Sequence, residues 1–276
     1  MPTQYFFDAI KHLHFLVKDG KEYPLIGTTT AISILDKPLA YWASGLAVTE
    51  LGWSPINDKE TKKKVPIEQR LPIASKRFEE VKKLSDIEYL GLLDKAYKAH
   101  AQSRDKSKDK GVDMHLLLEQ YIQGRIEAKE SPVPPEIEAF VRWSEKNVKQ
   151  FLFTEMHCYS DILHCGGVAD FGYLDTNGDF VLGDFKSSAV PYYSHFLQCG
   201  GYQLQIEENG GYTPEGKKIF DSRPIMYHAI FCERNGLDKP FFNRQTDKMR
   251  RAFSYTVNLY REKIWWDDGN FVEGGK

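Results

Sequence analysis

The chain has 276 residues, a formal net charge of −2 and 41% hydrophobic residues. This length and composition suffice for a sizeable core, so we expect the chain to fold unaided. A near-neutral charge excludes neither nucleic acids nor small molecules as partners. Lysine concentrates in two short runs, 59–64 and 104–110, which are typical of solvated loops, with phosphate contact as the alternative.

Cysteine spacing and hydropathy restrict the compartment. The cysteines are Cys158, Cys165, Cys199 and Cys232, without the CxxC spacing of zinc and redox sites, so we expect reduced thiols. The N-terminal segment has no basic stretch followed by an apolar core. No apolar run approaches the roughly 20 residues of a membrane-spanning helix. The sequence therefore predicts a cytoplasmic protein with no membrane partner.

The chain opens with alternating sequence. Asp19-Gly20 in the middle of this stretch predicts a β-hairpin over 14–26. The threonine run 28–30 is a suitable cap for a helix over 31–53, which we expect to break or kink at Pro38.

Helical periodicity dominates the next part of the chain. Prolines and lysine clusters indicate a loop over 54–75. From Ser75 a helical pattern passes through the polar link 103–110 and continues to residue 129. A proline cluster ends it, and a further helix is expected over 136–151.

The pattern then changes from helical to alternating. The expected elements are strands over 153–160, 166–174 and 179–186, a helix over 193–208, a strand over 223–233 and a helix over 243–266. No internal repeat or linker separates domains. We therefore expect a single α/β domain over 1–276, with a hairpin and helical region over 1–110 and a core over 111–276.

Two aspartates interrupt the apolar strands of GGVADFGYLDTNGDFVLGDFK. Other D/E-x-K triplets of the chain lie in polar or turn sequence, where water reaches the charge. Asp184 instead ends an apolar strand with Lys186 two residues later, and an unpaired buried charge there would cost several kcal/mol. A divalent cation would offset that cost. The alternative is an ordinary strand-end ion pair, with Asp170 as a residue beside the turn.

The loop length of this hairpin decides whether the aspartates meet. A two-residue turn at Asn177-Gly178 would put Asp170 and Asp184 on opposite faces of the sheet. A three-residue loop with Gly178 in the left-handed region would place the two aspartates directly opposite each other, with β-carbons about 5 Å apart. Carboxylates that close repel unless a cation lies between them, and hard oxygen ligands suit magnesium or manganese.

A helix before the strands adds a histidine. His115 and Glu119 are four residues apart and share a helix face. A lone histidine at such a position is also compatible with a satisfied core residue. If it instead reaches the hairpin, its helix should cross the sheet with Leu116 and Leu117 buried.

The helix after the strands carries a polar pair. Gln198 and Tyr202 are again four residues apart, with Gly200-Gly201 between them at a cost of roughly 1 kcal/mol per glycine. The glycines indicate close approach of backbone or substrate or, equally, packing of the helix on the sheet.

The order GVDMHxxxE, Glu155, GGVAD, DFK and QxxxY resembles the RecB-like branch of the PD-(D/E)xK nuclease superfamily, in particular phage-type and CRISPR-associated exonucleases. The resemblance covers roughly residues 111–205. The segment TTTAISILDKPLAYWASGLA also resembles the opening of phage members. The resemblance implies a restriction-endonuclease-like core, with a central mixed β-sheet flanked by helices and a helical N-terminal part.

The resemblance also implies a role for each motif residue. His115, Asp170, Asp184 and the backbone carbonyl of Phe185 would bind Mg²⁺ or Mn²⁺, and Lys186 would orient and activate the attacking water. Gln198 and Tyr202 would hold the nucleic acid strand near the scissile phosphate. Glu119 and Glu155 would act on metal-bound water or orient His115 and Lys186. Some relatives hold an iron–sulfur cluster, but the cysteines here are distributed differently, so we expect none.

The function implied is hydrolysis of DNA phosphodiester bonds, most simply by an exonuclease on single-stranded DNA or DNA ends. Phage or bacterial DNA processing, with a recombination or replication protein as partner, is the expected setting. Metal ions would supply the nucleophile and relieve charge in the transition state. The alternatives are an inactive nucleic-acid-binding module of the same fold and a metal-dependent hydrolase of small phosphoesters.

Overall fold

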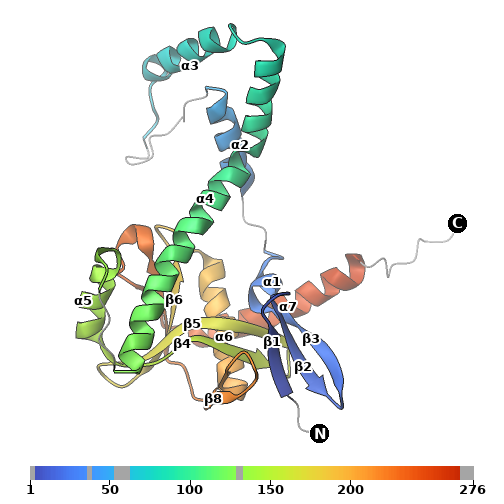
Figure 1. Cartoon of the computed structure of the whole chain (residues 1–276), viewed down its shortest axis with the longest axis vertical. Coiled ribbons are helices and arrows are strands. Elements are labelled where there is room, and N and C mark those ends of the chain that lie inside the picture. Colours follow the sequence, from blue (N-terminus) through green and yellow to red (C-terminus); the bar gives the residue numbers. More distant parts are fainter. Residues whose placement is uncertain (1–3, 36–38, 53–62, 129–132, 268–276) are drawn as a thin grey trace, which may run out of the picture. The chain divides into compact units, whose positions relative to one another are not determined.

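The computed structural model describes residues 4–35, 39–52, 63–128 and 133–267 (Figure 1). The chain divides into two compact units, Met1–Leu35 with Gly111–Lys276 and Asp36–Lys110. We call the first the sheet unit and the second the helical unit, and each is described by itself.

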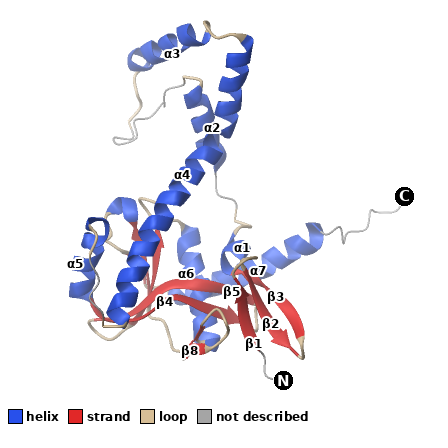
Figure 2. Cartoon of the chain, in the orientation of Figure 1, coloured by secondary structure: helices blue, strands red, loops and turns tan. Residues whose placement is uncertain are grey.

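The sheet unit is built on a curled mixed β-sheet with helices on its faces (Figure 2). Its described strands are β1 (Gln4–Asp8), β2 (Leu13–Lys18), β3 (Lys21–Gly27), β4 (Val148–Ser160), β5 (Cys165–Asp175), β6 (Phe180–Lys186), β7 (Gly211–Tyr212), β8 (Lys218–Phe220), β9 (Tyr227–Cys232) and β10 (Phe241–Asn243). Along one path the order is β1-β2-β3-β5-β4-β7-β8, and β6 joins β5 to β9 and β10. The β3–β5 and β6–β9 pairs are parallel and the others antiparallel.

Strand β5 has neighbours on both edges. β4 pairs with it antiparallel along nearly its whole length. On the other edge, β3 pairs with Cys165 and Gly166, whereas β6 pairs with the stretch from Phe171 to Leu174. Asp170 therefore lies between two ladders, where no strand pairs with this edge of β5 in the described register.

The helices of the sheet unit surround this arrangement. They are α1 (Thr28–Ile32), the part of α4 (Asp86–Ile126) from residue 111 onward, α5 (Glu138–Asn147), α6 (Tyr193–Asn209) and α7 (Thr246–Asp267), with short 3-10 helices η1 (Pro135–Ile137) and η2 (Glu233–Asn235). From α5 onward, the main elements follow the order helix, three antiparallel strands, helix and parallel strand. The connection from β6 through α6 to β9 is the crossover that a parallel pair requires.

Two hydrophobic clusters cover the two faces of the sheet. On one face, Leu118 of α4 and Phe140 of α5 pack in one cluster with Phe185. On the other face, Tyr202 of α6 packs in a cluster with Leu182. Because successive strand residues point to opposite faces, β6 supplies both clusters, and each fully buried apolar side chain contributes roughly 2 kcal/mol.

Most elements expected after residue 150 are confirmed. β5, β6, α6 and α7 lie within a few residues of their expected ranges, and β9 falls inside 223–233. The N-terminal hairpin is confirmed as well. Asp19 and Gly20, with φ of 50° and 75°, form its two-residue turn between β2 and β3.

The expected threonine cap is wrong. α1 begins at Thr28 with Gly27 as its N-cap, so the threonines lie inside the helix. The Thr28 hydroxyl instead links β5 to α6: it donates a hydrogen bond to the Gly166 carbonyl at 3.1 Å and accepts one from the Gln205 amide at 2.7 Å. Pro38 lies outside the described residues, and a separate helix α2 (Leu39–Glu50) follows it.

The helix expected over 136–151 ends early, because β4 begins at Val148. Phe151 is buried and pairs with Tyr173 of β5, so tertiary pairing overrides the helical pattern of the last residues.

In the helical unit, the loop expected over 54–75 is also wrong in part. α3 (Ile67–Val81) occupies its second half and contains Pro72. Ile67, Leu71 and Phe78 form an exposed apolar stripe at helical spacing, which the surrounding prolines and lysines obscured. The lysine run 104–110 is helical rather than a loop, because it lies within α4, whereas 59–62 lies outside the described residues. No described helix is long and apolar enough to cross a membrane.

Candidate active site

The loop between β5 and β6 has the three-residue form. The Asp175 amide donates to the Asp179 carbonyl at 3.0 Å, and the Gly178 amide donates to the Asp175 carbonyl at 3.0 Å. Gly178 has φ of 88°, a conformation in which a side chain would be strained. The predicted loop of residues 176–178 is therefore confirmed.

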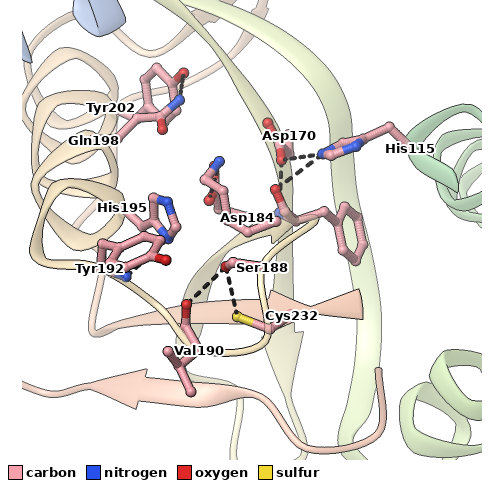
Figure 3. Close-up of polar contacts among 12 residues, drawn as sticks. His115, Asp170, Asp184, Ser188, Val190, Tyr192, His195, Gln198, Tyr202 and Cys232 are labelled. Atoms are coloured by element: carbon pink, nitrogen blue, oxygen red, sulfur yellow. Dashed lines mark hydrogen bonds and ion pairs between the residues drawn. The ribbon is translucent and has the colours of Figure 1, made fainter. Parts of the chain in front are cut away.

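This register brings the two aspartates to the same level of the sheet. The β5–β6 ladder ends at the pair Phe171–Gly183, and the next position would pair Asp170 with Asp184. There the strands separate, since β5 continues along β4 and β6 along β9. We call this place, where β5 and β6 diverge beyond the pair Phe171–Gly183, the fork. The Asp170 carboxylate bridges it by accepting a hydrogen bond from the Phe185 amide at 2.8 Å (Figure 3).

Asp184 is completely buried beside Lys186. The Lys186 Nζ lies 2.6 Å from Asp184 Oδ2. Burial raises the pKa of Asp184 to about 7 against the opposing charge of Lys186. Burial also disfavours the Lys186 ammonium, but the charges of Asp184 and Asp170 outweigh it and hold the pKa of Lys186 above its ordinary value. Asp184 Oδ1 has no hydrogen-bond partner in the described part of the chain.

Asp170 is kept ionised by its surroundings. Burial opposes its charge, but the hydrogen bond from His115, the Lys186 ammonium and the Phe185 amide together hold the pKa of Asp170 below its ordinary value. A carboxylate that is ionised at neutral pH is ready to bind a cation.

The imidazole of His115 reaches the fork from α4. Its Nε2 lies 3.1 Å from the Phe185 carbonyl oxygen and 3.6 Å from Asp170 Oδ2, and its ring meets the Phe185 ring edge-on. Figure 3 shows it approaching Asp170 from the side opposite to α6. Both a metal ligand and a histidine satisfied by hydrogen bonding are compatible with these contacts.

The helix that carries His115 is rotated from its expected setting. Leu118 is fully buried and Leu117 packs against the same cluster, but Leu116 is 49% exposed. The expected burial of Leu116 is therefore wrong, because Leu118 rather than Leu116 lies on the face that packs against the sheet.

Glu155 on β4 joins the cluster from the other neighbour of β5. The pairs on either side of it place it opposite Asp170. The residue is exposed at the surface, but the surrounding protein removes water from its carboxylate. This desolvation, followed by the charges of Asp170 and Glu119, raises the pKa of Glu155 to about 8. Its φ of 46° is strained for a residue with a side chain, as is common at functional sites.

Gln198 and Tyr202 lie on α6, on the opposite side of the carboxylates from His115 (Figure 3). The Gln198 amide donates to the Tyr202 hydroxyl at 2.7 Å. Burial and then the charges of Asp170 and Asp184 raise the pKa of Tyr202 well above its ordinary value. The structure thus brings the two motif residues together within the field of the aspartates.

The paired glycines of α6 serve packing of two helices. A β-carbon at Gly200 would lie 2.5 Å from the backbone carbon of Met249, and one at Gly201 would lie 2.7 Å from the Phe253 ring, both on α7. The close approach is therefore to α7, rather than to the sheet or to a substrate.

Sequence reasoning missed Glu233. It directly follows β9, whose last residue Cys232 lies opposite Lys186. Burial raises the pKa of Glu233 while the charge of His115 opposes the rise, and its Oε1 is buried with no hydrogen-bond partner among the residues described. The available signal was a carboxylate directly after an apolar strand.

The donor set fits a hard divalent cation. Three of the four expected ligand atoms converge, namely His115 Nε2, Asp170 Oδ2 and the Phe185 carbonyl oxygen, whereas the Asp184 carboxylate contacts Lys186. Over the described ranges, no group of three or more His, Cys, Asp or Glu side chains has the arrangement of a metal site. The unpaired Asp184 Oδ1, the Asp170 carboxylate and the Phe185 carbonyl are nevertheless oxygen donors of the kind that Mg²⁺ and Mn²⁺ accept.

No protein-family model matches this chain, and no curated protein matches it either.

Proposed function

We propose that this protein is a Mg²⁺- or Mn²⁺-dependent nuclease that hydrolyses DNA phosphodiester bonds. The observation that carries the proposal is the fork between β5 and β6. There Asp170, the Phe185 carbonyl and His115 meet, with the ion pair of Asp184 and Lys186 beside them. Such a constellation is more than a strand-end ion pair needs.

In this proposal, His115, Asp170, Asp184 and the Phe185 carbonyl hold the cation. A bound divalent cation supplies a hydroxide nucleophile at neutral pH and relieves charge on the phosphorane-like transition state. Asp184 would contribute Oδ1, the atom that its contact with Lys186 leaves without a hydrogen bond.

Lys186 orients and activates the attacking water. The Asp184 carboxylate contacts the Lys186 ammonium at 2.6 Å, so the lysine side chain is held in one conformation. A positive charge beside the water favours its deprotonated form. Because its pKa is raised, Lys186 acts as a fixed charge rather than as the proton acceptor.

Gln198 and Tyr202 hold the DNA strand beside the scissile phosphate. The amide and hydroxyl are bonded to each other at 2.7 Å, and both groups can turn a donor toward a phosphate oxygen. Glu119 and Glu155 would act on metal-bound water or orient His115 and Lys186, and the charges of Asp170 and Glu119 raise the pKa of Glu155.

The order of elements supports a restriction-endonuclease-like core for this proposal. A helix precedes three antiparallel strands, β4, β5 and β6, and α6 then leads to β9, which is parallel to β6. The motif residues lie on α4, β4, β5, β6 and α6, in the order that the RecB-like resemblance implies.

Single-stranded DNA or a DNA end is the substrate that we favour, with exonuclease activity in phage or bacterial DNA processing. Tyr192 and Tyr193 follow the strand that ends in Lys186, and each is 58% exposed. Exposed aromatic rings beside the site can stack on unpaired bases.

The test is digestion of end-labelled DNA, linear and circular, single- and double-stranded, with Mg²⁺ or Mn²⁺ and with EDTA. Metal-dependent release of short products from linear substrates alone supports an exonuclease, whereas cutting of circles indicates an endonuclease. Binding of DNA without cleavage under every condition would make the protein an inactive binding module. Turnover of bis-p-nitrophenyl phosphate that DNA does not inhibit would instead indicate a small-phosphoester hydrolase.

A further inference from the structure

A cavity of about 620 Å³ lies at the other end of the strands that carry the candidate active site. Its walls come from α6, the start of α7 and the segment 222–226 that leads into β9. The segment that lines the cavity leads to Tyr227 of β9, which pairs with Val181 near the start of β6. Lys186 of the candidate active site is at the other end of β6, so the length of this strand, about 20 Å, separates the cavity from the active site. The cavity is therefore a separate feature.

The floor of the cavity is a connected hydrogen-bond network. Gln203, which is 1% exposed, donates to Glu207 at 2.9 Å, and the Ile225 amide donates to the same carboxylate oxygen at 2.9 Å. Arg250 contacts the other oxygen of Glu207 at 2.8 Å and Asp247 at 3.1 Å. These contacts fix the floor and balance the charge of Arg250.

Two further arginines of the cavity have no such balance. The guanidinium of Arg223 lies 5.3 Å from the centre of the Phe180 ring, and that of Arg244 lies 5.7 Å from the centre of the Tyr227 ring. In the parts of the chain that the structure describes, neither arginine forms an ion pair with a carboxylate. Cation–π contact with the aromatic rings stabilises both guanidinium groups without neutralising their charge.

The ligand chemistry follows from these cations and from the shape. Guanidinium groups bind phosphate oxygens in pairs, and α7 begins at Thr246 in the cavity wall with the positive end of its dipole. Pro224 and Met226 add apolar surface for a flat group. A long DNA backbone suits the place less well, because Asp221 stands exposed next to the cavity wall and Asp247 lines it.

We infer that this cavity binds a small organic phosphate of mononucleotide size, with Arg223 and Arg244 on the phosphate. The volume is within the range of small-molecule sites and exceeds what inorganic phosphate needs. The inference goes beyond the proposed nuclease function and does not rest on it.

The experiment is isothermal titration calorimetry of the full chain with adenosine 5′-monophosphate, inorganic phosphate and adenosine, in EDTA. Saturable binding of the nucleotide is expected, and Arg223→Gln and Arg244→Gln should each weaken it about tenfold or more. Lys248→Gln is the matched control, because it removes one charge from the first turn of α7 without lining the cavity. Lys186→Ala should bind the nucleotide as the unaltered protein does, which separates this site from the nuclease site.

Three results of the titration itself would overturn the inference. These are the absence of saturable nucleotide binding, equal binding by the arginine variants, and binding of inorganic phosphate as tight as that of the nucleotide. Binding of a single-stranded oligonucleotide with no binding of the mononucleotide would also contradict it, since the occupant would then be a polymer. Thermal unfolding of each variant shows whether a lost signal reflects lost structure.

Discussion

Lys186 and Asp184 form a buried ion pair, and we expect both partners to matter for stability and for the proposed chemistry. The pair differs from the exposed ion pairs of the chain because both side chains are largely removed from water. A buried pair that loses one partner leaves an uncompensated charge, which typically costs about 3 kcal/mol or more.

Lys186→Ala should therefore abolish DNA cleavage and lower the free energy of unfolding by about 3 kcal/mol. Metal binding should remain, whereas Asp184→Ala should lose both cleavage and metal binding, as measured by digestion assays, urea unfolding and calorimetry with Mn²⁺. Lys82→Ala is the control, since Lys82 pairs with Glu79 at 3.0 Å on an exposed surface. This substitution should leave cleavage and metal binding unchanged and should change the free energy of unfolding by no more than about 1 kcal/mol. Cleavage by Lys186→Ala near the rate of the unaltered protein would remove Lys186 from the mechanism.

His115 is the residue at which a ligand role and a packing role differ most clearly. His115→Ala should reduce cleavage strongly and move the metal titration to higher concentrations, because one ligand is lost. Metal affinity of the unaltered protein should weaken in acid, since a protonated imidazole cannot bind a cation. His100→Ala, on the same helix α4, is the control. A stable His115→Ala protein with an unchanged metal titration would leave a site of carboxylates alone.

At the scale of elements, the contact between α6 and α7 shows how packing can reverse a local preference. Gly200 lies in mid-helix, where alanine normally stabilises a helix by about 1 kcal/mol relative to glycine. Here the added β-carbon would meet the backbone of Met249 at 2.5 Å, a distance that only a shift of α7 can relieve.

Gly200→Ala should consequently lower the midpoint of urea unfolding, by an equivalent of about 1–3 kcal/mol. Gly91→Ala in α4 should raise it or leave it unchanged, because nothing lies within 4 Å of the added β-carbon. The two substitutions are chemically identical and both are within helices, so their difference isolates the packing contact. Equal effects of both substitutions would show that α7 does not approach Gly200 as described.

At the scale of the whole molecule, a buried polar cluster joins the N-terminal strands to β4. The Tyr5 hydroxyl lies 2.6 Å from His14 Nδ1 and 3.0 Å from His157 Nδ1. A single hydroxyl proton can serve only one of these nitrogens, so the other imidazole must donate to the tyrosine oxygen. The imidazole that accepts from the tyrosine must be neutral, and burial disfavours a charge on the other.

The cluster should make the protein acid-sensitive. Burial and then the charge of His157 lower the pKa of His14 to about 4, from about 6.5 in the unfolded chain, and burial lowers the pKa of His157 as well. A lowered histidine pKa gives full stability above pH 6.5, and stability declines as the pH falls from 6.5 toward 4. The loss from His14 alone should approach about 3 kcal/mol.

Urea unfolding between pH 4 and pH 7.5 tests this dependence. His14→Phe should flatten the decline, because the unfolded state no longer gains a proton at that position. His100→Gln, at a partly exposed position, should keep the full decline. An unaltered slope in His14→Phe would mean that other groups control acid unfolding.

The sequence by itself determined the local features of the site. The sequence places a turn around Asn177-Gly178 between two alternating strands, and the structure decides that its loop has three residues, which puts Asp170 level with Asp184. These features involve neighbours within about 15 residues, where turn geometry and alternation leave few options. For the same reason, β5, β6, α6 and the first hairpin lie close to their expected positions.

Only the tertiary structure decided which distant groups come near the fork. His115 lies 55 residues before Asp170, and Glu233 lies 49 residues after Asp184. Their arrival depends on how α4 packs through Leu118 and on the parallel pairing of β9 with β6. Neither leaves a periodic trace in the sequence, because long-range contacts arise from the shapes of whole packed faces rather than from the spacing of residues along the chain.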